Sequence, residues 1–386
     1  MREIKTERIP IWLWADYMED GAKKQAINLA LHPYTFNHIA IMPDNHQGYG
    51  VPIGGVAATK GVIIPEAVGV DIGCGMRAVK TSLINIPINK LQTIVDEIKL
   101  KIPVGFSHRQ ESLQKYMPTQ FAPKILETIY KEYDSACHQL GTLGGGNHFI
   151  EIQKGDDGNI WIMVHSGSRN LGKKVADHHI RIANEQTEKS EVNIPHSWEL
   201  DYLYINSIEG RYYIDEMRYC MLFAKANRLY MMDEIQKIIL NEYPETRFIS
   251  EYDVHHNYAE IENHYDQNVM VHRKGATSAR RGEIGIIPGS QGTSSYIVEG
   301  RGNQKSFMSC SHGSGRTMGR GVAKRTLNFE EQKSLLDNQG IIHDMISVDA
   351  LDEAPGAYKQ IEEVIKQQMD LVKPIVRLTP LAVIKG

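Results

Sequence analysis

Five side chains of metal-binding types stand beside glycine or at the end of an apolar run of the sequence. They supply one carboxylate, one thiol and three imidazoles, and they are Asp71, Cys74, His148, His165 and His256. Five donors that include a thiolate are too many for a closed, four-coordinate structural zinc site. They suit one metal ion with an open coordination position, or two metal ions that share a ligand.

Each donor also has an ordinary structural interpretation when it is taken alone. In VDIGCGM (70–76), an aspartate can cap its own turn beside an inert cysteine. The histidines of GGGNHFIE (144–151) and VHSGSRN (164–170) are equally compatible with packed side chains. In DVHHNYAE (253–260), two adjacent histidines project differently, so usually only one of them enters a given site. The metal hypothesis therefore rests on the five donors taken together.

The direction of the side chains in 144–151 depends on where a strand begins. In a regular strand, Asn147 and His148 point to opposite faces, and Glu151 shares the face of Asn147. This holds only for a strand that is regular through 151, so the assignment of His148 does not depend on it.

The segment from Val271 to Arg325 is strongly basic, although the formal net charge of the chain is −4. It holds ten lysines and arginines against Glu283 and Glu299, a net charge of +8, together with eleven glycines. Basic side chains and exposed backbone amides suit phosphates. A solvated charged face is the alternative, but such faces are normally helical and balanced by acidic residues. This segment also contains CSHGSGRTMGR (310–320), where one histidine stands among small residues and arginines.

A metal centre beside a phosphate-binding segment indicates metal-assisted phosphoryl or nucleotidyl chemistry. The spacing does not separate hydrolysis from transfer. The common nucleotide folds are not supported, because the chain has no GxxxxGK[ST] and its GxGxxxG at 48–54 misses the dinucleotide pattern.

Helical and strand-like segments alternate, which predicts a mixed α/β (α+β) fold with a polar, exposed segment near 185–202. The length of the chain permits one large domain or two or three smaller ones. Gly-rich strand segments are expected within 48–81, 141–153, 160–169 and 283–300. Helices are expected over 14–31, 90–100, 111–136, 171–188, 211–242, 329–339 and 356–371. The four cysteines have no paired spacing and no apolar run approaches ~18 residues, so we expect a cytoplasmic protein that does not enter membranes.

Ten blocks of the sequence together resemble the RtcB family, the RNA-splicing ligases that use GTP and manganese. They span nearly the whole chain in order: MPDNHQGYGVPIGG, GVDIGCGM, GGGNHFIE, HSGSR, HHNYA, HRKGAT, IPGSQGTSSYIV, SHGSGR, DEAPGAYK and the terminal VIKG. Two departures are Gln291, where methionine is expected, and Val254, where cysteine is common. Neither removes a candidate ligand.

The resemblance implies a single catalytic domain over 1–386, with a polar insertion near 185–202. Its strands and helices would interleave around a central metal site, in neither a Rossmann nor a P-loop fold. It implies that the five donors bind two Mn²⁺ ions with Cys74 as the bridging thiolate. His312 would attack the α-phosphorus of GTP to form a histidine–GMP intermediate, and Asp44 would orient His312 through its far ring nitrogen.

The resemblance also implies a GTP pocket. Asn147 and Asn257 would contact the phosphates or the sugar, and Glu151, Ser295 and Lys385 would read the guanine. A carboxylate that accepts from guanine N1 and N2 explains a preference for GTP over ATP. The remaining predicted pocket residues are Pro288, Gly289, Ser290, Gln291, Gly313, Ser314, Gly315 and Arg316.

The family reaction joins an RNA 3′-phosphate or 2′,3′-cyclic phosphate to a 5′-hydroxyl, through an RNA 3′ end activated by GMP. An activating accessory protein is compatible with this reaction. The substrate choice stays open between tRNA halves and RNAs cut during stress or by toxins. The RNA-binding candidates are Arg169, Arg273, Lys274, Arg280 and Arg281.

Two other functions are compatible with parts of the pattern. A metal-dependent phosphodiesterase or phosphatase would use the same metals, but not a guanine-reading carboxylate or a lysine in the tail. A catalytically silent RNA-binding protein would not need all five donors and His312. Both alternatives predict that no covalent GMP forms.

Overall fold

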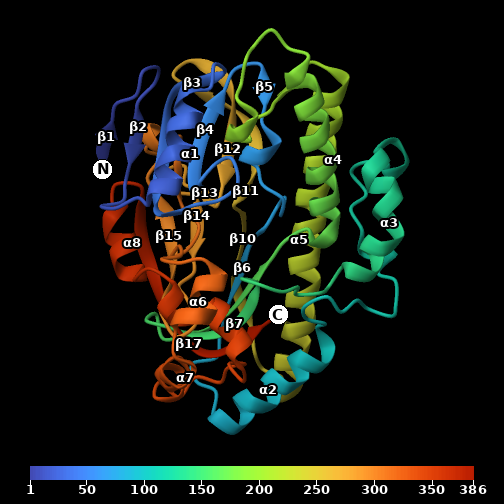
Figure 1. The fold of residues 1–386 in the computed structure, drawn as a ribbon. Helices are drawn as coiled ribbons and strands as arrows, with labels where there is room; N and C mark the ends of the chain where they lie inside the picture. Colours follow the sequence, from blue (N-terminus) through green and yellow to red (C-terminus); the bar gives the residue numbers. More distant parts are fainter.

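The computed structural model describes all residues 1–386, and it is a mixed α/β structure with two large sheets beside a layer of helices (Figure 1). The larger sheet has the strand order β10-β6-β8-β7-β17-β15-β14 and is antiparallel throughout. Its edge strands β10 and β14 approach each other, so the sheet nearly closes into a barrel. Its strands are β6 (Gly75–Thr81), β7 (Phe149–Gly155), β8 (Ile160–Ser166), β10 (Phe248–His255), β14 (Ile284–Ile287), β15 (Ser295–Gly300) and β17 (Val372–Lys385).

The second sheet has six strands in the order β1-β2-β3-β4-β12-β11, and only its β2–β3 pair is parallel. Two small sheets pair β5 (Val62–Ile63) with β9 (Leu203–Tyr204), and β13 (Ala276–Ser278) with β16 (Ser309–Ser311). The six strands are β1 (Arg2–Ile4), β2 (Ile11–Leu13), β3 (Thr35–His46), β4 (Ile53–Thr59), β11 (Asn257–His264) and β12 (Gln267–Lys274).

The helix α5 (Ile208–Glu242) runs beside the sheets and joins two hydrophobic clusters (Figure 1). Along one stretch it packs with α3 (Glu127–Gln139) and α4 (Arg169–Glu188). Along the other it packs against α2 (Ile88–Lys101) and the apolar side chains of β7 and β8. The hydroxyl of Ser207 accepts from the Gly210 amide and caps the first turn of α5. The chain's longest helix thus provides a buried wall behind the larger sheet.

The other helices are short. They are α1 (Asp20–Leu31), α6 (Arg320–Thr326), α7 (Phe329–Asp337) and α8 (Ile361–Gln367). Short 3₁₀ helices are η1 (Pro65–Ala67), η2 (Gln114–Tyr116), η3 (Pro123–Ile125), η4 (His196–Trp198), η5 (Gln304–Ser306), η6 (Val348–Glu353) and η7 (Pro355–Ala357). No helix combines the length and the apolar character that a membrane crossing needs.

The predicted helices over 90–100, 171–188, 211–242 and 329–339 are confirmed within a few residues. The prediction over 111–136 is wrong before Glu127, because two prolines break that segment into turns of 3₁₀ helix. The predictions over 14–31 and 356–371 are too long, since α1 begins at Asp20 and α8 spans only 361–367. In 185–202, α4 continues to Glu188, and the mostly exposed remainder buries Ile194 and Leu200 in a core cluster.

Candidate functional site

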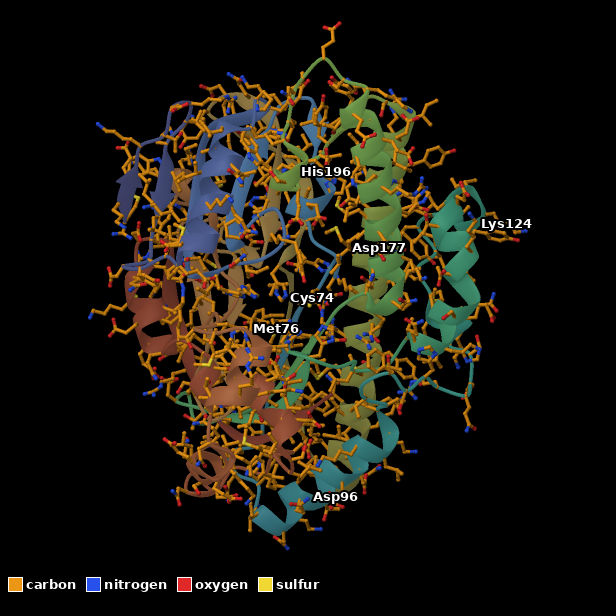
Figure 2. All side chains as sticks on the ribbon, viewed as in Figure 1. Cys74, Met76, Asp96, Lys124, Asp177 and His196 are labelled. Carbon is orange, nitrogen blue, oxygen red and sulfur yellow. The ribbon has the colours of Figure 1, made fainter.

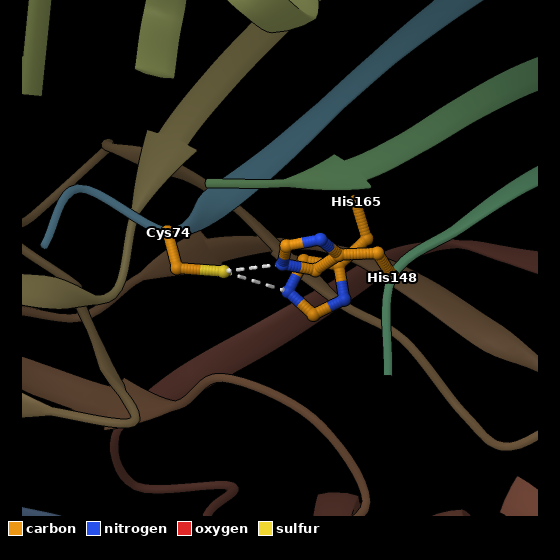
Figure 3. A group of neighbouring side chains, drawn as sticks. All are labelled: Cys74, His148 and His165. Carbon is orange, nitrogen blue, oxygen red and sulfur yellow. Dashed lines mark hydrogen bonds between the residues drawn. The ribbon is translucent and has the colours of Figure 1, made fainter. Parts of the chain in front are cut away.

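Three of the predicted ligands meet inside the molecule. The Sγ of Cys74 lies 3.5 Å from Nε2 of His148 and 3.3 Å from Nε2 of His165, as Figure 3 shows. All three side chains are buried, and Cys74 lies near the middle of the molecule in Figure 2. These separations suit donors around one ion with metal–ligand bonds of about 2.0 to 2.3 Å.

The two remaining predicted ligands extend the group on both sides. An Asp71 carboxylate oxygen lies 3.1 Å from Nε2 of His148. On the other side, Nε2 of His256 lies 3.3 Å from Nε2 of His165. The neighbouring His255 turns away and contacts the Gly73 carbonyl with its Nδ1, 2.9 Å away. Only one of the two adjacent histidines therefore reaches the site, as the sequence predicts.

Strand pairing explains why residues so far apart in the chain converge. The strand β6 lies between β8 and β10, and β8 also pairs with β7. In this antiparallel order, the starts of β6 and β7 and the ends of β8 and β10 meet at one edge. Cys74 and His148 directly precede β6 and β7, His165 is next to last in β8, and His256 directly follows β10.

The backbone sets the tautomer of His165. Its Nδ1 lies 3.0 Å from the Asn147 carbonyl, which only accepts, so Nδ1 carries the proton and Nε2 keeps its lone pair. The Nδ1 of His148 lies 3.0 Å from the Leu143 carbonyl and 3.3 Å from a guanidinium nitrogen of Arg169. Burial also lowers the pKa of His165 and His256, which keeps both imidazoles neutral.

The thiol of Cys74 needs a cation to ionise. Burial raises its pKa, and the charge of Asp71 raises it further. A nearby divalent ion reverses this effect, because a coordinating thiol is deprotonated outright. One thiol, three imidazoles and one carboxylate thus form a donor set that fits a divalent transition metal.

His312 lies next to this donor group on the loop after β16. Its ring centroid is 4.7 Å from that of His256. Its Nδ1 lies 2.7 Å from Oδ2 of Asp44, and the same oxygen accepts from the His312 amide at 3.1 Å. Asp44 is fully buried in β3. The carboxylate therefore fixes the ring so that the lone pair of Nε2 is free.

The backbone beside Asp44 leaves no room for another side chain. Gly315 has a φ of +74°, and a Cβ there would lie 2.0 Å from the Asp44 carbonyl oxygen. Lys359 donates to the carbonyls of Pro43 and Asn45, at 2.9 and 2.6 Å, and so holds both neighbours of Asp44. Gly315 thus serves close packing of the His312 loop against β3.

One cavity of about 750 Å³ is lined by His312, by most of the predicted nucleotide-binding residues and by four of the five predicted metal ligands, Asp71, Cys74, His165 and His256. Its lining includes Asn147, Glu151, Asn257, Lys385, Pro288, Gly289, Ser290, Gln291, Gly313, Ser314, Gly315 and Arg316. Ser295 does not line the cavity. It lies behind the lining residues, where its hydroxyl accepts from the amide of Gly289 and the side chain of Gln153. Asn257 uses its own amide group to bridge the Asp71 carbonyl and the Gly275 amide.

Comparison with known proteins agrees with this constellation. A family model described as tRNA-splicing ligase RtcB matches residues 25–131 and 116–386. The chain belongs to the RtcB family. It is 38% identical to an RNA-splicing ligase RtcB of Escherichia coli, over 99% of both chains. It is 30% identical to a tRNA-splicing ligase RtcB of Thermococcus kodakarensis, over 99% of this chain and 96% of that one.

In this RtcB chain, the end of the cavity formed by β7 and β17 holds two buried titratable side chains, Glu151 and Lys385. Burial raises the pKa of Glu151 to about 8, although Lys385 and Gln153 act in the other direction. Burial also lowers the pKa of Lys385, whose ammonium lies 3.7 Å from Glu353. This end of the cavity therefore presents one carboxyl group and one amine.

Glu353 is a member of this site that the sequence analysis missed. Its buried carboxylate contacts Arg316 at 3.3 Å and Arg320 at 2.9 Å, and it accepts from the Tyr358 hydroxyl. It thus gathers several cations of the RtcB cavity around one negative charge. Its motif, DEAPGAYK, is one of the blocks that resemble the RtcB family. Only the fold shows that Glu353 contacts two arginines more than thirty residues away in the chain.

Two of the RNA-binding candidates are buried. Arg273 is fully buried and pairs with Glu262 and Ser309, so the prediction that it contacts RNA is wrong. Lys274 is 5% exposed, yet it lines the cavity and donates to the carbonyls of Tyr49 and Glu66. Arg169 turns inward, with a guanidinium nitrogen 3.3 Å from Nδ1 of His148.

Arg280 and Arg281 are exposed, and neither lines the cavity. Arg280 also lies 3.3 Å from the buried Glu262. Part of the positive charge of 271–325 is therefore neutralised by internal ion pairs. The basic side chains of this segment that line the cavity are Lys274, Arg316 and Arg320.

Two adjacent residues of α5 hold the metal-binding loops from behind, and the sequence analysis missed both. Arg228 is fully buried and donates to the carbonyls of Gly73 and Ser166, at 3.1 and 2.9 Å. These carbonyls neighbour Cys74 and His165 in the chain. The same guanidinium pairs with Asp253 at 2.6 Å.

Asn227 holds the glycine-rich loop in the same way. Its side-chain oxygen accepts from the amides of Gly141 and Thr142, at 2.7 and 3.2 Å. Its side-chain nitrogen donates to the Ser166 hydroxyl at 3.1 Å and the Gly167 carbonyl at 3.3 Å. In the sequence both residues are polar members of a long amphipathic helix, so no local signal marks them.

Proposed function

We propose that the protein is a GTP- and manganese-dependent RNA ligase. It would join an RNA 3′-phosphate or 2′,3′-cyclic phosphate to a 5′-hydroxyl through a GMP-linked His312. Membership of the RtcB family supports this proposal. The structural observation that carries it is the position of His312, oriented by Asp44 and lying against His256 in the cavity of the metal donors.

In the first step, Nε2 of His312 attacks the α-phosphorus of GTP. The bond from that phosphorus to the bridging oxygen breaks, and pyrophosphate leaves. The proton on Nδ1 stays hydrogen-bonded to Asp44, which stabilises the positive charge that develops on the ring. Two Mn²⁺ ions held by Asp71, Cys74, His148, His165 and His256 would neutralise the triphosphate and align it for attack.

In the second step, an oxygen of the RNA 3′-phosphate attacks the phosphorus of the histidine-bound GMP. The P–N bond breaks, His312 is restored, and the RNA ends in a diphosphate bridge to guanosine. The 5′-hydroxyl of the second RNA then attacks the RNA phosphorus, loses its proton and releases GMP. A cyclic phosphate must first be opened by water to give the 3′-phosphate.

Selection of guanine is assigned to Glu151 and Lys385 at one end of the cavity. A carboxylate of Glu151 accepts from N1–H and N2–H of guanine, and the Lys385 ammonium donates to O6. Adenine lacks the two donors and carries an amine in place of O6. Asn147, Asn257 and the loops 288–291 and 312–316 are assigned to the phosphates and the sugar.

We further propose that residues 1–386 act as one catalytic domain in the cytoplasm. The candidate metal ligands, the nucleophile and the lysine next to the C-terminus all contribute to one cavity or the shell behind it. All four cysteines are free and buried, which agrees with a reducing compartment.

The test is a joining assay with defined RNA ends, run with GTP and Mn²⁺. RNA with a 3′-phosphate should join to RNA with a 5′-hydroxyl, whereas RNA with a 3′-hydroxyl should not join to RNA with a 5′-phosphate. His312→Ala should abolish joining. Opening of cyclic phosphates without any joining would favour the phosphodiesterase alternative instead.

A further inference from the structure

Tyr49 is an exposed aromatic residue in the lining of the cavity. Its side chain is 72% exposed, and no role in metal or guanine binding accounts for it. Single exposed apolar residues are common on protein surfaces. Tyr49 differs from them in two respects, namely its place at the reaction cavity and the rigidity of the loop that carries it.

The loop is fixed by four hydrogen bonds to three side chains. The side chain of Gln25 donates to the Gly48 carbonyl at 2.7 Å and accepts from the Gly48 amide at 3.1 Å. The Gly50 amide donates to Glu199 at 2.8 Å, and Lys274 donates to the carbonyl of Tyr49 itself. Because the backbone on both sides is held, the ring is presented to solvent from a pre-organised position.

The loop also lies near the nucleophile. The side chain of Ile53 lies against Gly48 on one side, because a Cβ added at Gly48 would be 3.4 Å from Cδ1 of Ile53. On its other side, Ile53 contacts Gly275. Gly275 in turn lies against the nucleophile, because a Cβ added there would be 3.1 Å from Cε1 of His312. One side chain therefore separates the Tyr49 loop from the catalytic ring, and the buried amine of Lys274 lies beside it.

Val70 adds a second apolar group at this part of the cavity. It is 43% exposed and follows Gly69, whose Cβ position is 3.3 Å from Cε of Lys274. An aromatic ring and an aliphatic group thus line the same cavity as His312. This combination suits the flat, apolar face of a nucleobase whose phosphate lies deeper in the cavity.

We propose that Tyr49 stacks on the 3′-terminal nucleobase of the RNA strand that receives GMP from His312. This inference rests on the proposed ligase function and adds a binding site for single-stranded RNA. Every base has a π face, so stacking holds the RNA end without reading its sequence. The 3′-phosphate end is assigned here because it must reach the GMP on His312.

The experiment uses full-length enzyme already carrying GMP and follows single-turnover transfer to RNA with a 3′-phosphate. Tyr49→Ala should raise the RNA concentration for half-maximal rate about tenfold or more, as expected for loss of one stacking contact. Tyr49→Phe should match the parent. The control is Tyr130→Ala on α3, an exposed tyrosine (58%) outside the cavity lining, which should also match the parent.

A second RNA, with an abasic 3′-terminal nucleotide, separates stacking from a change in the loop. With this RNA the parent and Tyr49→Ala should become equal. Equal half-saturation with ordinary RNA, or a difference that persists with abasic RNA, would overturn the proposal. Labelling of His312 by GTP should be the same in all variants. A parent enzyme that takes up no GMP would instead contradict the proposed function itself.

Discussion

The Nδ1 of His312 lies 2.7 Å from a carboxylate oxygen of Asp44, a side chain with no exposure to solvent. The same oxygen accepts from the backbone amide of His312. Burial alone raises the pKa of a carboxyl group, but the hydrogen bond and charge of His312 outweigh it, so the pKa of Asp44 is lowered. Asp44 therefore stays ionised, and it governs the orientation and the charge of the imidazole.

Asp44→Asn should slow guanylylation of His312 by about 100-fold or more, because a neutral amide neither fixes the tautomer nor stabilises an imidazolium. Single-turnover labelling with GTP measures this rate. The half-saturating GTP concentration should change little, since Asp44 is not in the cavity lining. Asp337→Asn is the control, because Asp337 also pairs with a histidine, His343, but outside the cavity. An unchanged rate in Asp44→Asn would show that the pair does not act in catalysis.

Cys74→Ser should weaken binding of divalent metal by about 100-fold or more, because it removes the thiolate at the centre of the donor group. Titration calorimetry with Mn²⁺ measures the affinity, and Co²⁺ provides a second readout. The sulfur-to-cobalt charge-transfer band should appear in the parent and be lost in the variant. Cys137→Ser, at a buried cysteine on α3, should keep both properties. A parental spectrum in Cys74→Ser would remove the thiol from the metal site.

GTP binding should strengthen as the pH rises from 7 to 9. Burial raises the pKa of Glu151 to about 8, so the carboxyl group is mostly protonated at pH 7 and ionised at pH 9. Only the carboxylate accepts from both guanine donors. The half-saturating GTP concentration for His312 labelling should therefore fall through this range, by up to about tenfold per pH unit below the pKa. In Glu151→Gln it should be higher and should not fall between pH 7 and pH 8, and a parent in which it does not fall over that range would contradict the assignment.

Arg228→Lys should weaken metal binding by about 10- to 100-fold, the usual effect of losing a group that supports metal ligands. A lysine cannot reach Asp253 and the carbonyls of Gly73 and Ser166 together. The matched control is Arg77→Lys, because Arg77 is also buried and pairs with Asp253 but contacts neither loop. Both variants should lower the melting temperature, and only Arg228→Lys should change the metal affinity. Equal losses of affinity would show that the effect is one of general stability.

The candidate site was more predictable from the sequence than the fold. The residue types at 71, 74, 148, 165 and 256 suffice to predict a metal centre, and their convergence at one sheet edge agrees with that prediction. Contacts between distant segments define the roles of Glu353, Asn227 and Arg228. No local sequence pattern indicates such contacts. Long periodic helices such as α5 were predicted well. The strand β17 was missed because it contains Pro374 and Pro380, which the structure accommodates beside shifts of register.

The central claim is that His312 carries GMP, and labelling of the protein with GTP radioactive at the α-phosphate tests it most directly. The full-length protein is incubated with Mn²⁺ and labelled GTP and then separated under denaturing conditions, with His312→Ala alongside. We expect label on the parent that is lost in acid, as for a phosphoramidate, and no label on the variant. Metal-loaded protein that takes up no label, or label that persists in His312→Ala, would contradict the account.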